Sequence, residues 1–247
     1  MDDWITVDEL RLAAHVARPN TAAPVPAVAL CHGFPTGPRR SASSALTFPE
    51  LADRIAREIG WLALTFNFRG TGASQGDFSP AGWLADLRAV VGVLEARDDV
   101  RDVWLVGVAE GGTLAVCAAA ADGQVRGLAT LAAPSSLRDW GRDPTRLVEY
   151  ARRVGMISTP GFPPSPGAWG RESAAVDARA AAPRLAGRPV LLLHGSDDAV
   201  VAVDDARSLQ AALGPAADLR VVPGAGHELR HDPRAIAVLL GWLDRRY

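Results

Sequence analysis

The chain has 247 residues, 48% of them hydrophobic, which suits one α/β domain (1–247) with a sheet buried on both faces. Its 26 Lys and Arg residues are balanced by 28 Asp and Glu, and no long basic run is present, so we expect no nucleic-acid partner. No apolar stretch is long enough to span a bilayer and the acidic start resembles no secretory signal, so we expect no membrane partner and a cytoplasmic protein. Cys31 and Cys117 lie in apolar runs typical of buried thiols, and we expect no metal and no cofactor.

The chain begins with two short alternating runs, residues 4–7 and 10–16, which predict an antiparallel hairpin at one edge of a sheet. Apolar runs then predict strands at 25–30, 62–68, 103–106, 128–131, 190–193 and 219–222, separated by segments with helical periodicity. One helix is expected to start at a capping box of Thr47 and Glu50, with Pro49 in its first turn. This alternation predicts the α/β class, with a mostly parallel sheet and helices on both faces.

The segment 135–175 interrupts this alternation after the strand at 128–131. It contains Asp143-Pro144, a short amphipathic run and a Pro/Gly-rich stretch at 159–170. A plain surface connection is one interpretation. Because long irregular excursions in compact α/β domains are more often functional, we expect a small lid inserted into the domain.

The strand at 103–106 runs directly into the sequence Gly107-Val108-Ala109-Glu110-Gly111-Gly112, and helix-forming residues follow. Glycines here could serve close packing alone. The segment also resembles the nucleophile elbow of α/β-hydrolases, where small residues permit a sharp turn from strand to helix. By this resemblance, Ala109 occupies the position of the catalytic nucleophile.

Two further loops resemble the same family. The sequence Cys31-His32-Gly33-Phe34 resembles the loop that supplies one oxyanion-hole amide, which implies the N–H groups of Phe34 and Glu110 as the two donors and a structural role for His32. Residues 67–74 resemble the D-x-R-G-x-G-x-S turn, with Asn67 in place of Asp and with Arg69 expected to organise the loop.

The two remaining motifs follow the last two predicted strands. The stretch 190–201 resembles the strand end that carries the catalytic acid and implies Asp198, with Asp197 as a competitor by adjacency. The stretch 223–227 resembles the G-x-G-H loop and implies His227 as the catalytic histidine. Five motifs in the family's order, each at a strand end, resemble the lidded, small-molecule branch of the α/β-hydrolase superfamily, which includes carboxylesterases, acyl hydrolases and related peptidases.

The resemblance implies an acyl hydrolase scaffold of the Ser-His-Asp type, acting on an ester or amide of modest size. Ala109 has no oxygen with which to attack, so we expect the chain as written to be inactive or strongly impaired. Nothing in the spacing of Ser74 or Ser135 supports a substitute nucleophile. Trp140, Phe162 and Trp169 are expected to form apolar walls of the pocket.

Three explanations for Ala109 stay open. It is an introduced substitution in a competent serine hydrolase, or a natural loss that leaves a non-catalytic protein binding a small ligand in the same pocket. In the third, Asp198 and His227 activate water directly and Glu110 assists. We rank the third lowest, because a side chain that starts a helix need not face the pocket. The sequence does not predict the oligomeric state.

Overall fold

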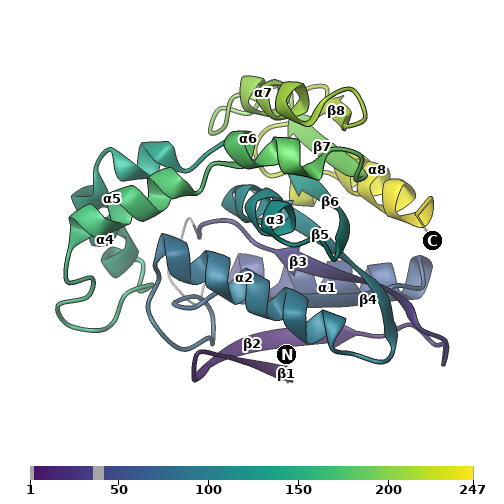
Figure 1. The fold of residues 1–247 in the computed structure, drawn as a ribbon, viewed down its shortest axis with the longest axis horizontal. Coiled ribbons are helices and arrows are strands. Elements are labelled where there is room, and N and C mark those ends of the chain that lie inside the picture. Colours follow the sequence, from purple (N-terminus) through teal and green to yellow (C-terminus); the bar gives the residue numbers. More distant parts are fainter. Residues whose placement is uncertain (1–2, 36–41, 247) are drawn as a thin grey trace.

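The computed structural model describes residues 3–35 and 42–246. Within these residues, eight strands form one sheet in the order β1-β2-β4-β3-β5-β6-β7-β8 (Figure 1). The strands are β1 (Asp3–Val7), β2 (Leu10–Ala17), β3 (Val25–Cys31), β4 (Leu62–Phe66), β5 (Val100–Val108), β6 (Val125–Leu131), β7 (Val190–Gly195) and β8 (Asp218–Val222). All eight predicted strand regions are confirmed, with shifts of a few residues at their ends.

The first two strands form the predicted hairpin. Val7 pairs with Leu10, and the two residues between them, Asp8 and Glu9, have φ angles of 47° and 68°. Positive φ at both central residues is typical of the two-residue turn whose twist matches an antiparallel pair. Because β2 also pairs antiparallel with β4 while β3 to β8 run parallel, the sheet is mixed.

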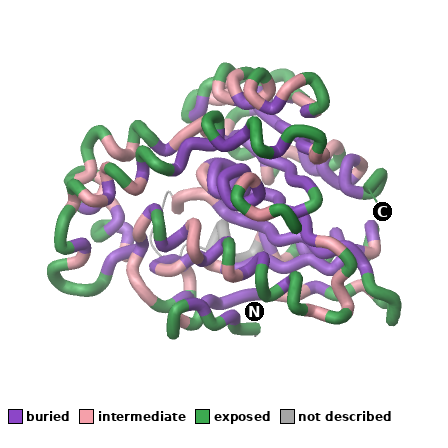
Figure 2. Tube along the Cα trace, viewed as in Figure 1, coloured by how far each residue is buried: buried purple, intermediate pink, exposed green. Residues whose placement is uncertain are grey.

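Helices cover both faces of the sheet (Figure 1). They are α1 (Ala42–Glu58), α2 (Pro80–Glu95), α3 (Glu110–Ala121), α4 (Pro144–Arg153), α5 (Pro166–Ala175), α6 (Ala178–Ala181), α7 (Val203–Leu213) and α8 (Pro233–Asp244), with short 3-10 turns η1 (Arg138–Gly141), η2 (Ala182–Leu185) and η3 (Leu229–His231). Along β3, Ala27 and Ala29 join the core under α2, α3 and α7, while Val28 and Leu30 join the core under α1 and α8. The whole strand is therefore buried, as expected between two helical layers (Figure 2).

The predicted start of α1 is wrong. The helix begins at Ala42, so Pro49 lies well inside it rather than in its first turn. A proline inside a helix removes one intrahelical hydrogen bond and its ring crowds the preceding turn, but the face formed by Phe48, Ala52 and Ile55 is buried in the core beside the sheet. The burial of this face offsets the local cost, and the helix continues upstream.

After β6 the chain leaves the sheet and forms η1, α4 and α5, which project beyond one end of the sheet (Figure 1). Trp169 of α5 is buried, and its ring lies 5.0 Å from that of Phe78, just before α2. The projecting segment is therefore anchored to the body of the molecule by aromatic packing.

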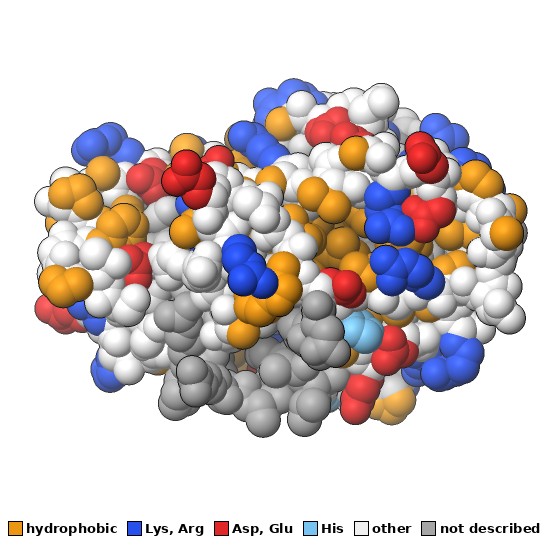
Figure 3. All heavy atoms as spheres, turned by 90° about the horizontal axis from the view of Figure 1, so that it is seen from below, with side chains coloured by type: hydrophobic (Ala, Val, Ile, Leu, Met, Phe, Trp, Pro, Cys, Tyr) orange, Lys and Arg blue, Asp and Glu red, His pale blue; other side chains and the backbone are white. Residues whose placement is uncertain are grey.

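On the face seen in Figure 3, acidic and basic side chains are interspersed, without a continuous field of one sign. Across 3–35 and 42–246, no helix combines the length and the apolar character needed to cross a membrane.

Candidate active site

Ala109 lies on a sharp kink between β5 and α3. Its φ of 49° and ψ of −125° place it in a region that residues with a β-carbon rarely adopt. The neighbouring glycines explain how the kink is accommodated. A β-carbon on Gly107 would lie 2.3 Å from the carbonyl oxygen of Gly111, and one on Gly111 would lie 2.4 Å from that of His32. The close packing of strand, kink and helix therefore needs glycine at both positions.

Asp198 and His227 meet at the same end of the sheet. Asp198 follows β7, His227 follows β8, and Oδ2 of Asp198 lies 2.9 Å from Nδ1 of His227. The other carboxylate oxygen, Oδ1, accepts hydrogen bonds of 2.9 Å from the N–H groups of Val200 and Val201. Burial raises the pKa of Asp198, but the donated bonds from Val201, His227 and Val200 outweigh it, so the pKa is lowered and the carboxylate stays ionised.

The neighbouring carboxylate has a different environment. Asp197 is exposed, and its Oδ1 accepts a bond of 2.6 Å from the hydroxyl of Ser196. The acid that faces His227 is therefore Asp198.

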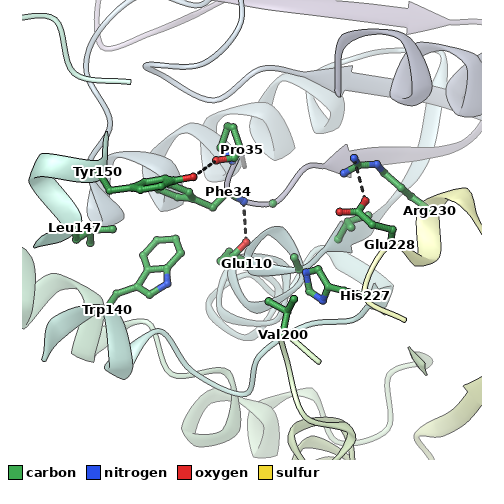
Figure 4. Close-up of a pocket in the computed structure, with 13 residues that line it drawn as sticks. Phe34, Pro35, Glu110, Trp140, Leu147, Tyr150, Val200, His227, Glu228 and Arg230 are labelled. Carbon is green, nitrogen blue, oxygen red and sulfur yellow. Dashed lines mark hydrogen bonds and ion pairs between the residues drawn. The ribbon is translucent and has the colours of Figure 1, made fainter. Parts of the chain in front are cut away.

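A cavity of about 430 Å³ connects Ala109 and His227 (Figure 4). Its size lies in the range typical of small-molecule sites. The lining residues are Gly33, Phe34, Pro35, Val108, Ala109, Glu110, Trp140, Leu147, Tyr150, Val200, His227, Glu228 and Arg230.

The side chain of Glu110 points into this cavity. Its Oε2 accepts a hydrogen bond of 2.7 Å from the N–H of Phe34, one of the two expected oxyanion donors. Burial raises the pKa of Glu110 despite the opposing hydrogen bonds from the N–H groups of Phe34 and of Glu110 itself and the charge of His227. The reason for ranking direct water activation lowest, that this side chain need not face the pocket, therefore does not apply here. Side chains in a helix lean toward its N-terminus, and here that direction leads to the loop after β3.

A model of the alpha/beta hydrolase family matches residues 28–239. The chain belongs to the α/β-hydrolase family. Among solved structures, this family member is similar to Est1E from Butyrivibrio proteoclasticus with ferulic acid bound, at 20% identity and a TM-score of 0.75, covering 99% of this chain and 97% of that one. It is also similar to a mutant meta-cleavage product hydrolase from Pseudomonas fluorescens IP01 complexed with acetates (19%, TM-score 0.69, covering 100% and 99%) and to acetyl xylan esterase 1 from Thermoanaerobacterium (19%, TM-score 0.67, covering 99% and 82%). A search of curated proteins found no significant match.

Of the three aromatic residues predicted as pocket walls in this α/β-hydrolase, one lines the described cavity and two lie elsewhere. Trp140 lines the cavity, whereas Phe162 and Trp169 are not among the described residues that do. Their rings lie 6.1 Å apart, and Trp169 is buried against Phe78. Their rings instead pack within the projecting segment and against the body of the molecule.

Several residues that line the cavity belong to no motif and were not predicted from the sequence. Leu147 and Tyr150 stand three positions apart on α4, so the amphipathic spacing of that helix was the available signal. Glu228 and Arg230 lie one and three positions after His227 and form an ion pair of 3.1 Å at the cavity. Nothing in the sequence indicated that this pair would line a pocket.

Two motif residues brace the loops around the site in this α/β-hydrolase. The imidazole of His32 donates from Nδ1 to the carbonyl oxygen of Gly33 at 2.7 Å and accepts at Nε2 from the N–H of Phe68 at 3.2 Å. Arg69 donates to the buried carboxylate of Asp86 through its backbone and its guanidinium, at 2.6 to 2.9 Å. Within the described part of the chain, no group of three or more His, Cys, Asp and Glu residues is placed to hold a metal ion.

Proposed function

We propose that this chain binds a small acyl compound, a carboxylic ester or related amide, on a Ser-His-Asp scaffold whose serine position is held by Ala109. The observation that carries the proposal is the convergence on one cavity of the kink at Ala109 and the His227 side chain, whose Nδ1 lies 2.9 Å from Asp198. In a complete triad the imidazole deprotonates the serine, and the carboxylate orients and stabilises the imidazolium.

The methyl group of Ala109 cannot form an acyl-enzyme. Loss of a triad nucleophile leaves a residual acceleration of roughly 10³ to 10⁴ over water, supplied by binding and the remaining polar groups. Ester hydrolysis through residue 109 is therefore closed to this chain. The intact pairing of His227 with Asp198 supports a scaffold in which only the route through a serine is lost.

The walls of the cavity favour an aromatic or branched acyl group. The ring of Phe34 lies 4.9 Å from that of Trp140 and 5.6 Å from that of Tyr150, so three rings form one apolar wall. Trp140 and Tyr150 come from the segment 135–175, which we propose acts as a lid over the bound compound. Est1E, which is similar in fold, holds ferulic acid, an aromatic acid.

A second candidate is a non-catalytic protein that binds a small ligand in the same pocket. The observation that favours it is the hydrogen bond from the N–H of Phe34 to Oε2 of Glu110. This bond engages a donor that an oxyanion would need.

The test is Ala109→Ser treated with a fluorophosphonate probe and assayed with p-nitrophenyl butyrate. We expect no label on the unaltered chain, and a label at position 109 together with faster turnover in the variant. The control is Ala132→Ser, which places a serine at another buried, positive-φ residue, one that follows β6 and is absent from the cavity lining. If folded Ala109→Ser neither labels nor hydrolyses, the binding protein is the better description.

A further inference from the structure

The carboxyl group of Glu110 is placed where the reaction of a serine hydrolase would need hydrogen-bond donors. Its Oε2 lies 2.7 Å from the N–H of Phe34. A β-carbon built on Gly33 would be 2.9 Å from this oxygen and 2.7 Å from the β-carbon of Ala109. The carboxyl group therefore lies against the Gly33-Phe34 peptide and beside the nucleophile position, and Figure 4 shows it between Phe34 and His227.

The protonation state of Glu110 decides what this arrangement can do. As a carboxylate it would repel the negative charge that develops on a substrate carbonyl oxygen, and it would keep the N–H of Phe34 engaged. As a neutral carboxyl group it keeps the same bond at Oε2 and carries a proton on Oε1. It then becomes a hydrogen-bond donor at the place where the oxyanion would form.

The surroundings of Glu110 favour the neutral form. Burial raises its pKa. The titratable groups at the cavity besides Glu110 and Tyr150 are few: His227, whose Nδ1 faces Asp198, and the Glu228 and Arg230 pair, whose charges offset each other. The described lining residues from η1 and α4 are Trp140, Leu147 and Tyr150, and those from the loops after β3 and β7 are Gly33, Phe34, Pro35 and Val200, none of which brings a formal charge at neutral pH.

We propose that Glu110 is the general acid of a hydrolysis that needs no serine, in which it protonates the substrate carbonyl oxygen while His227 deprotonates the attacking water. The proposal rests on the proposed function, because it requires an acyl compound in this cavity. It assigns a chemical role to a side chain that the family resemblance uses only for its backbone N–H. The chemistry is general acid and base catalysis without a covalent intermediate.

The protons and bonds balance over two steps. In the first, the water oxygen bonds to the carbonyl carbon, the water proton goes to Nε2 of His227, and the Glu110 proton goes to the carbonyl oxygen. This leaves a neutral tetrahedral intermediate, a Glu110 carboxylate and an imidazolium held by Asp198. In the second, the bond to the alcohol oxygen breaks, the imidazolium protonates that oxygen, and one hydroxyl proton returns to Glu110. The products are one carboxylic acid and one alcohol.

The test compares Glu110→Gln with Glu149→Gln, which makes the same change on the exposed side of α4, outside the cavity lining. With p-nitrophenyl butyrate we expect Glu110→Gln to lower kcat by roughly 10² to 10⁴-fold, the range typical of general acid catalysis. We expect Glu149→Gln to stay within about threefold of the unaltered chain. The unaltered chain should lose activity as the pH rises through the raised pKa of Glu110, and Glu110→Gln should lack this decline.

Three outcomes would overturn the role of Glu110. The first is a Glu110→Gln variant with unchanged kcat and an unchanged decline of activity with rising pH. The second is an acyl-enzyme seen by mass spectrometry during turnover. The third is calorimetric binding of methyl ferulate without hydrolysis of any tested ester. The third outcome leaves the proposed binding of an acyl compound in place. Absence of both binding and turnover would instead remove the proposed function itself.

Discussion

The Asp198 carboxylate both accepts hydrogen bonds from the backbone of its own loop and faces His227, and substitutions at this position can distinguish the two roles. In Asp198→Ala, the N–H of buried Val201 loses its acceptor out of reach of water, which costs about 1–3 kcal/mol. The N–H of Val200 also loses this acceptor, but water can take its place because Val200 is 73% exposed. The bond to the partly exposed His227 adds about 0.5–1.5 kcal/mol. We therefore expect the free energy of unfolding to fall by about 1.5–4.5 kcal/mol.

Asp198→Asn keeps an oxygen for both backbone N–H groups and places an amide NH₂ toward His227. We expect it to lower the free energy of unfolding by less than about 1.5 kcal/mol, while the imidazole proton moves from Nδ1 to Nε2. Urea denaturation measures the stabilities, and nitrogen NMR identifies the tautomer. Asp197→Ala, at the exposed neighbour, should stay within about 0.5 kcal/mol. Equal losses in the Ala and Asn variants would refute the reasoning, because the backbone bonds would then contribute nothing.

Two further predictions concern the loops that hold the site. Burial lowers the pKa of His32 to about 4, whereas an unfolded histidine titrates near about 6.5, so the unfolded state binds this proton first as the pH falls. The free energy of unfolding should therefore decrease between these two pH values by up to about 3 kcal/mol, and urea titrations of His32→Asn should show a flatter dependence. Gly111→Ala should lower the free energy of unfolding by more than about 3 kcal/mol, because the new β-carbon would meet the carbonyl oxygen of His32 at 2.4 Å. Gly92 lies on the exposed side of α2, and a β-carbon built on it would contact nothing within 4 Å, so Gly92→Ala should raise the free energy of unfolding by about 0.5–1 kcal/mol. Thermal denaturation measures both variants, and a shift of the two in the same direction would contradict this explanation.

The fold could be predicted from the sequence because the central strands β3, β4, β6 and β7 are buried on both faces and appear as continuous apolar runs. The carboxyl ends of β3, β5, β7 and β8 carry the site, and parallel strands bring such ends to one edge, so motifs at strand ends predicted which residues would meet. Local small residues likewise predicted the kink at Ala109.

Prediction from the sequence was poorer where the contacting residues are far apart along the chain. The direction of the Glu110 side chain depends on the N–H of Phe34, which is 76 positions away, and no local pattern encodes that contact. The choice among Trp140, Phe162 and Trp169 depends on how an irregular segment packs. The start of α1 was misplaced because the burial of one helix face outweighs a local capping pattern.

The most direct measurement is a crystal structure of the unaltered chain with methyl ferulate bound at a pH near neutrality. We predict the ester in the cavity, with its carbonyl oxygen roughly 2.7–3.1 Å from the Glu110 carboxyl group and its carbonyl carbon facing Nε2 of His227. An ester bound elsewhere, or a Glu110 side chain turned away from the bound carbonyl group, would contradict the account.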